Sequence, residues 1–175
     1  DKGAKWIVVD PRYSRSAAQA DIYARIRPGT DIAFYGGLIR YIIENKLYQK
    51  EYILHYTNAA CILRPDFKFN EETGLFSGWD PETKRYDNET WGYDVDKKVG
   101  WDTTPGSAFS WVNDPNVPKF KTPDLKVLKR DMTLTDPNCV LNVMRRHYAR
   151  YTPEMVHRVT GMDMDVMKKV WDTFA

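Results

Sequence analysis

Two aspartates near the start of the chain stand where a carboxylate could bind a nucleoside. Asp10 directly follows the apolar run at residues 6–9, and Asp31 falls at the expected start of a helix. A carboxylate has two oxygens, so it can accept from both ribose hydroxyls, or from the ring N–H and exocyclic amine of guanine. From the residues alone, this nucleoside role stands beside the ordinary roles of aspartate in turns and helix caps.

The residues near these aspartates could bind the diphosphate of a nucleotide. The loop after the apolar run continues as Pro11, Arg12, Tyr13 and Ser14, and the second turn reads Gly29-Thr30-Asp31. A diphosphate needs positively charged donors, because its charge must be neutralised on burial. Exposed arginines are nevertheless commoner than arginines that bind a ligand. Four arginines lie in this stretch: Arg12, Arg15, Arg25 and Arg27.

A strand must position the first loop. The apolar run at residues 6–9 predicts a fully buried parallel strand whose carboxyl end opens at Asp10. Ligands of open α/β sheets bind outside the carboxyl ends of the strands, so this loop lies where a nucleotide would. Residues 16–20 predict a short helical turn and residues 22–27 a second strand. No GxGxxG motif occurs, so a usual nicotinamide or flavin site is not indicated.

A helix must position the second turn. Thr30 or Asp31 is expected to cap it, and its apolar spacing ends near residues 44–46. Gly36-Gly37 lies inside this helix, so either the glycines permit close packing against a backbone or ligand, or they are simply tolerated. Residues 49–56 predict another short helix. The expected buried face of the first helix is Tyr35, Leu38, Ile39, Ile42 and Ile43.

The middle of the chain loses all periodicity. From about residue 61 to residue 136, prolines and glycines interrupt a segment rich in aromatic residues, which predicts an irregular insert covering a partner or a neighbouring domain. Helices are expected again at Asp136-Pro137, Thr152-Pro153 and Asp163, with a stop at Gly161. Six aromatic anchors are expected to hold the insert: Phe67, Phe69, Phe76, Trp79, Trp91 and Trp101.

The predicted fold class is therefore α/β, with three parts. Residues 1–60 form the strand-loop-helix part, residues 61–135 the insert, and residues 136–175 short helices that return to the α/β domain. The helix from Asp136 is expected to bury Val140, Leu141, Met144 and Tyr148.

Composition excludes several classes of protein. The 26 basic and 24 acidic side chains nearly cancel to a formal charge of +2, which gives no case for binding nucleic acid or an anionic membrane. No apolar run approaches the roughly 20 residues that span a bilayer. Cys61 and Cys139 belong to no close-spaced ligand motif and are expected to be buried small hydrophobes. The chain starts at Asp1 and soon enters a strand, so we expect it to be part of a longer polypeptide.

The stretch VVDPRYSRSAAQADIYARIRPGTDIAFYGGLIRYIIE resembles the cofactor-binding region of molybdopterin oxidoreductases, the DMSO reductase family, and most closely the catalytic subunits of formate dehydrogenases. The resemblance continues through YILHYTNAACIL and GLFSGWDPETKRYDNETWGYD. It then extends over RDMTLTDPNCVLNVMRRHYARYTPEMVHRVTG, which is similar to the respiratory, periplasmic type. Residues 99–126 are the exception and look like an insertion.

The resemblance implies a Rossmann-like parallel-sheet domain that binds a bis(molybdopterin guanine dinucleotide) cofactor holding molybdenum or tungsten. Two motifs of this sequence match the family's contacts to one guanosine end. The implied reaction is the two-electron oxidation of formate to carbon dioxide, or its reverse. The implied cofactor-binding residues are Asp10, Pro11, Arg12, Tyr13, Ser14, Gly29, Thr30 and Asp31.

The resemblance also implies partners and a location. The family's 4Fe-4S cysteine motif, its metal-binding selenocysteine or cysteine and its catalytic histidine and arginine have no counterpart in this sequence. The stretch alone is therefore expected to be catalytically inert. Its expected partners are the remainder of the catalytic subunit, which would hold those motifs, and an iron-sulfur beta subunit. A periplasmic location is implied. Two alternatives stay open, another molybdopterin oxidoreductase with a different substrate and a non-catalytic binding or assembly module.

Overall fold

The computed structural model describes residues 2–95 and 128–175, and these form a mixed α/β structure with two compact units. One unit comprises Asp1–Gln49 and Tyr148–Ala175, and the other comprises Lys50–His147. The units thus divide after residues 49 and 147, whereas the sequence suggested divisions after residues 60 and 135. Trp101 and the expected insertion at residues 99–126 lie outside the described residues.

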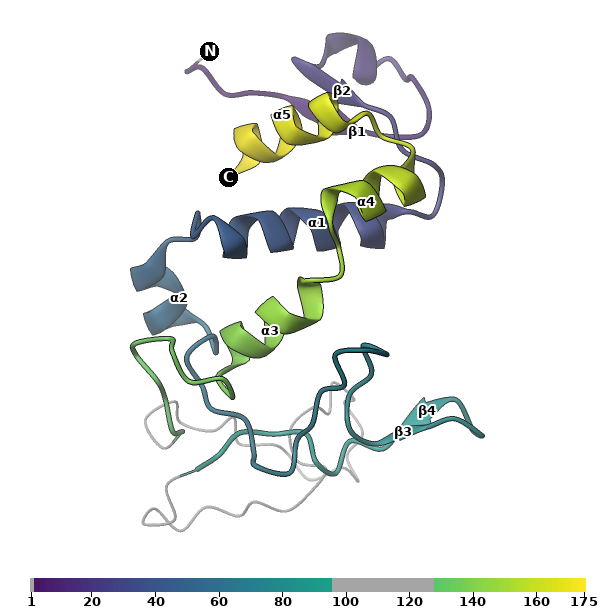
Figure 1. The fold of residues 1–175 in the computed structure, drawn as a ribbon. Coiled ribbons are helices and arrows are strands. Elements are labelled where there is room, and N and C mark those ends of the chain that lie inside the picture. The colour runs from purple at the N-terminus through teal and green to yellow at the C-terminus, as the bar shows by residue number, and fades with distance from the viewer. Residues whose placement is uncertain (1, 96–127) are drawn as a thin grey trace, which may run out of the picture. The chain divides into compact units, whose positions relative to one another are not determined.

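The first unit contains a small parallel sheet (Figure 1). Strand β1 (Ile7–Val9) pairs with β2 (Ile22–Ala24), and the 3-10 helix η1 (Ala17–Gln19) lies between them in the chain. Both predicted strands and the predicted helical turn are confirmed, but the second strand ends at Ala24 and not at residue 27. The expected full burial of β1 is wrong, because each residue of β1 is only half-buried in the described two-stranded sheet, where β2 covers a single edge.

Three helices complete this unit, and two of them begin at a side chain that caps the helix. Helix α1 (Asp31–Glu44) begins after Thr30, α4 (Pro153–Thr160) after Thr152, and α5 (Met164–Phe174) after Asp163. The Thr152 hydroxyl accepts from the Met155 N–H at 3.2 Å, which makes it the expected cap. Gly161 ends α4 with a φ of 70°, a conformation that glycine adopts at little cost.

The glycines of α1 allow this helix to approach two bulky neighbours. A Cβ on Gly37 would lie 2.7 Å from both the Trp171 ring and a Val156 methyl, and one on Gly36 would lie 2.5 Å from the Tyr151 ring. Close packing against these side chains therefore accounts for the pair, where the sequence suggested a backbone or ligand as the neighbour. The core of the unit consists of Ile22, Ala24, Ile26, Phe34, Leu38, Val156, Met162, Met167, Val170 and Trp171.

The predicted face of α1 is partly wrong. Tyr35 is 56% exposed, whereas its neighbour Phe34 is 3% exposed and lies in the core. The buried face is turned toward Phe34 and Gly37 because the glycine gives the helix backbone room to reach Trp171.

The second unit has little regular structure among its described residues. It contains α2 (Lys50–Tyr56), most of α3 (Val140–Tyr148) and a hairpin of β3 (Trp79–Asp80) and β4 (Arg85–Tyr86). Single bridges tie residues 61–63 to three distant segments, pairing Cys61 with Arg130, Ile62 with Cys139 and Leu63 with Tyr93. Ring contacts connect Phe67, Phe69, Phe76, Trp79, Tyr86, Trp91 and His147.

The helix expected from Asp136-Pro137 begins later, at Val140. Asp136 accepts from the Asn138 N–H through its carboxylate at 2.7 Å and from the Cys139 N–H through its carbonyl at 3.1 Å. These bonds form a turn, and the Val140 N–H then bonds to the Cys61 carbonyl at 3.0 Å. The buried residues of α3 are consequently Leu141, Asn142 and Val143, while Val140, Met144 and Tyr148 are half-buried.

Candidate cofactor-binding loops

The first predicted loop and the segment that leads to the second leave the sheet at the same edge. Val9 is the partner of Ala24 in the parallel pair, so Asp10 and Arg25 both follow their strands at the carboxyl end. This is the edge at which ligands of open α/β sheets bind. The structure thus places Asp10 beside the end of β2, from which the chain leads through Arg25 to Asp31.

In the first loop, Asp10 serves partly to hold the backbone. Its Oδ1 accepts from the Arg12 N–H at 2.6 Å, and its carbonyl accepts from the Tyr23 hydroxyl at 3.0 Å. The Asp10 N–H donates to the Ala24 carbonyl at 3.1 Å, so the loop is tied to β2. One carboxylate oxygen, Oδ2, remains without a hydrogen bond among the described residues, and it is available to a ligand.

Beyond Asp10, the first loop presents an aromatic ring to the surface. Tyr13 is 65% exposed and meets the Tyr23 ring edge to face, with centroids 5.1 Å apart. Pro11 is half-buried. The Ser14 hydroxyl accepts from the N–H of Ala17, the first residue of η1, at 3.3 Å. Tyr13 therefore offers a largely exposed ring that packs against Tyr23 at the carboxyl end of β1.

The second loop differs from its expected capping geometry. Thr30 occupies the position before α1, but its hydroxyl donates to the Arg27 carbonyl at 2.7 Å and caps no N–H. Gly29 has a φ of 76° and open space where a side chain would begin. Asp31, at the first position of α1, is exposed and makes no side-chain hydrogen bond or ion pair within the described part of the chain. Both of its oxygens are free at the positive end of the helix dipole.

The four arginines divide into two groups. Arg12, Arg15 and Arg25 are exposed, and their guanidinium groups have no partner among the described residues. Arg27 is different, because its Nη1 donates to the carbonyls of Arg158 and Val159 at 2.6 and 3.0 Å. Three guanidinium groups are thus available to an anion, while the fourth is used at the end of α4. Sequence reasoning missed this contact because the partners lie 131 and 132 residues away.

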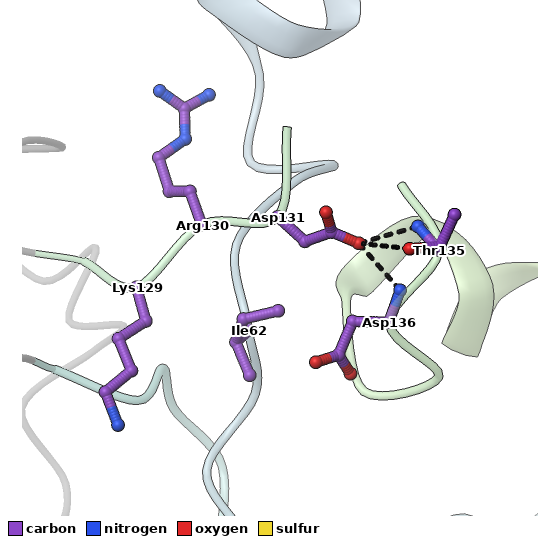
Figure 2. Close-up of a pocket in the computed structure, with 6 residues that line it drawn as sticks. All are labelled: Ile62, Lys129, Arg130, Asp131, Thr135 and Asp136. Carbon is purple, nitrogen blue, oxygen red and sulfur yellow. Dashed lines mark hydrogen bonds between the residues drawn. The ribbon is translucent and has the colours of Figure 1, made fainter. Parts of the chain in front are cut away.

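A pocket of about 640 Å³ lies in the other unit and contains none of the predicted residues (Figure 2). Several of its polar groups bind within the protein, since Asp131 accepts from the Thr135 and Asp136 N–H groups at 2.6 Å each and Lys129 pairs with Asp94 at 2.6 Å. Figure 2 shows the Arg130 and Lys129 side chains pointing in opposite directions. The two basic side chains among the described lining residues therefore do not converge on a ligand.

The two cysteines are buried and free, as expected. Burial raises the pKa of the Cys61 thiol, and it also raises that of Cys139. Within residues 2–95 and 128–175, no group of three or more histidine, cysteine, aspartate or glutamate side chains could hold a metal ion. In that same part of the chain, none of the helices combines the length and apolarity needed to cross a membrane.

Sequence comparison identifies the class of protein to which the chain is related. Over 96% to 99% of its length, it is 37% to 42% identical to major or alpha subunits of formate dehydrogenases, which are oxidoreductases. This confirms the resemblance seen in the sequence. The chain spans about 14% of the length of these relatives. No protein-family model matches it.

Three particular relatives illustrate the range of sequence identity and coverage. The nitrate-inducible formate dehydrogenase major subunit of Escherichia coli is 42% identical over 98% of this chain and 14% of its own length. The formate dehydrogenase alpha subunit of Megalodesulfovibrio gigas is 37% identical over 99% of this chain and 14% of its own length. A sulfite dehydrogenase subunit of Allochromatium vinosum is 26% identical over 97% of this chain and 16% of its own length.

Among solved structures, acetylene hydratase from Pelobacter acetylenicus aligns with 97% of this chain and 12% of its own. The TM-score is 0.46 and the sequence identity is 19%. A likeness at these values carries no inference about function.

Proposed function

We propose that the chain is the part of a formate dehydrogenase large subunit that binds one guanosine end of a bis(molybdopterin guanine dinucleotide) cofactor. The observation that carries the proposal is the match to formate dehydrogenase major subunits along nearly the whole chain. The geometry supports it, because residues 10–14 and the segment that leads to the Gly29-Thr30-Asp31 turn leave a parallel strand pair at its carboxyl end, where ligands of open α/β sheets bind.

The free groups at this edge fit a guanosine diphosphate moiety. The Asp31 carboxylate can accept two hydrogen bonds from the guanine edge or from the ribose hydroxyls. Arg12 and Arg25, with Arg15, offer the positive charge that a diphosphate requires. Tyr13 and the free oxygen of Asp10 would bound the site, and Gly29 leaves room for close approach of a ligand to the backbone.

The cofactor would supply the redox chemistry when bound, and this chain would bind and orient it. The proposed reaction is the two-electron interconversion of formate and carbon dioxide, with molybdenum or tungsten held elsewhere in the subunit. We further propose that the α/β unit is part of a Rossmann-like domain. The remainder of the subunit would carry a 4Fe-4S cluster and dock an iron-sulfur beta subunit. The enzyme would be periplasmic, and residues 61–135 would contact a neighbouring domain or subunit.

A second substrate is supported by one comparison, the 26% identity to a sulfite dehydrogenase subunit over 97% of the chain. The full-length protein separates the two candidates when formate and sulfite oxidation are assayed side by side with an artificial electron acceptor. Turnover of sulfite without turnover of formate would reject the formate reaction but leave the cofactor site in place.

The Asp31→Ala variant of the full-length protein tests the site. We expect guanine nucleotide and metal content per polypeptide to fall by at least about tenfold, since two hydrogen bonds to a charged group would be lost, each with a net contribution of about 1.5–3 kcal/mol. The measurements are nucleotide release by acid hydrolysis followed by chromatography, and metal analysis by mass spectrometry.

Asp165→Ala is the matched control for this variant. Asp165 is an exposed aspartate in the first turn of α5, so its removal produces the same loss of charge at a helix start. We expect it to leave nucleotide and metal content unchanged. Equal content in wild type, Asp31→Ala and Asp165→Ala would reject the assignment of Asp31.

A further inference from the structure

Arg27 connects the Gly29-Thr30-Asp31 turn to a helix from the far end of the chain. Its N–H donates to the Thr160 carbonyl at 2.8 Å, and its Nη1 donates to the carbonyls of Arg158 and Val159 at 2.6 and 3.0 Å. These are the unsatisfied carbonyls at the end of α4, where a cation is favoured by the helix dipole. Arg27 therefore has backbone and side-chain bonds to a single helix terminus.

The contact is close enough to depend on the residue that ends α4. Gly161 has a φ of 70°, and a Cβ placed there would lie 3.2 Å from the Arg27 Cζ. A side chain at this position would both strain the backbone and push against the guanidinium. The path of the chain after α4 is thus matched to the position of Arg27.

The turn itself has few other attachments. Nothing lies within 4 Å of the position that a Gly29 side chain would occupy, and the Asp31 side chain has no partner among the described residues. The Thr30 hydroxyl donates to the carbonyl of Arg27, so even this bond leads back to the same residue. Apart from the start of α1, Arg27 supplies the connections that fix the turn.

We propose that Arg27 is a positioning residue, which uses the carboxyl end of α4 as an anchor to hold Gly29, Thr30 and Asp31 in the geometry that receives the cofactor. The inference rests on the proposed function and assigns Arg27 a role different from that of the free arginines. Arg27 would set where the Asp31 carboxylate lies, and it would not itself bind the diphosphate.

The test uses four variants of the full-length protein. Arg27→Met removes the fork of donors, Arg27→Lys keeps the charge but offers a single ammonium, and Gly161→Ala disturbs the same contact from the side of α4. Thr152→Ala is the matched control, because it removes the cap at the opposite end of α4. Each is measured for guanine nucleotide content and for amide hydrogen exchange in peptides that cover residues 27–34.

We expect Arg27→Met and Gly161→Ala to lower nucleotide content at least threefold and to raise exchange across residues 27–34 at least tenfold. Arg27→Lys should lie between Arg27→Met and wild type. Thr152→Ala should raise exchange within α4 while nucleotide content and exchange across the turn stay at the wild-type level.

Three results would overturn the positioning role. The first is wild-type nucleotide content in Arg27→Met, and the second is an equal loss in Thr152→Ala, which would make the effect one of helix stability. The third is a loss of nucleotide content in Arg27→Met without faster exchange in the turn, which would indicate that Arg27 binds the cofactor directly. Absence of guanine nucleotide from the wild-type protein would instead reject the proposed function itself, so the two failures are distinguishable.

Discussion

Replacing Trp171 by alanine is expected to destabilise the first unit by about 3–5 kcal/mol, the usual cost of removing a large aromatic side chain from a core. Trp171 is 3% exposed, packs against the glycine of α1 at position 37, and lies 5.6 Å from the Tyr41 ring between centroids. Gly37 cannot fill the resulting cavity because it has no side chain. Amide exchange in α1 and α5 of the full-length protein should accelerate by about 100-fold to 3,000-fold where exchange requires unfolding of this unit.

Trp171→Phe is the control that separates the loss of packing volume from the effect of the unpaired indole N–H. The Trp171 Nε1–H is buried without a partner among the described residues, so the smaller ring removes an unsatisfied donor while it keeps most of the volume. We expect this variant to cost about 1 kcal/mol or less, because the lost volume and the removed penalty oppose each other. A cost of Trp171→Phe equal to that of Trp171→Ala would contradict this account of the core.

Replacing Asp131 by asparagine is expected to loosen the turn that precedes α3. The Asp131 carboxylate accepts from the N–H groups of Thr133, Thr135 and Asp136 at 2.8, 2.6 and 2.6 Å, and from the Thr133 hydroxyl. An amide nitrogen would face donors where an oxygen accepts now, so we expect a loss of about 1.5–3 kcal/mol. Hydrogen exchange in peptides covering residues 128–140 of the full-length protein measures it.

The same carboxylate predicts a pH dependence. The Thr133 hydroxyl, followed by the Asp136 N–H, holds the pKa of Asp131 well below its ordinary value of 3.8. Because the pKa is lowered in the folded state, the stabilisation is fully present above about pH 4 and decreases as the pH falls further. The difference between wild type and Asp131→Asn, corrected for intrinsic exchange rates, should therefore be smaller at pH 3 than at pH 6.

Asp87→Asn serves as the control for Asp131→Asn. Asp87 is exposed, and its carboxylate accepts one hydrogen bond from within the described part of the chain, from the Glu89 N–H at 3.0 Å. We expect its replacement to change stability by no more than about 0.5 kcal/mol at either pH. An equal effect of the two substitutions would show that the bonds to Asp131 contribute nothing beyond those of an ordinary surface aspartate.

Signals that act within a few residues predicted the local structure well. Thr152-Pro153, Gly161 and Asp163 mark helix boundaries through bonds to N–H or C=O groups at most four residues away, so they need no distant partner. Asp136-Pro137 carries the same kind of signal and failed. Its turn is fixed by Asp131 and by the pairing of residue 140 with Cys61, and both interactions lie outside the window of a capping motif.

By itself, the sequence determined the two strands, the helices of the first unit, the relation to formate dehydrogenase subunits and the identity of the candidate loops. Tertiary structure alone decided which groups in those loops are free. Parallel pairing makes the segments that lead to both loops leave the sheet at one edge. The α4 carbonyls bind the Arg27 guanidinium, and Asp31 keeps both oxygens open within the described part of the chain. The reason is physical, because a residue type states which bonds a side chain can make, whereas the distant segments folded against it determine which of those bonds are already made.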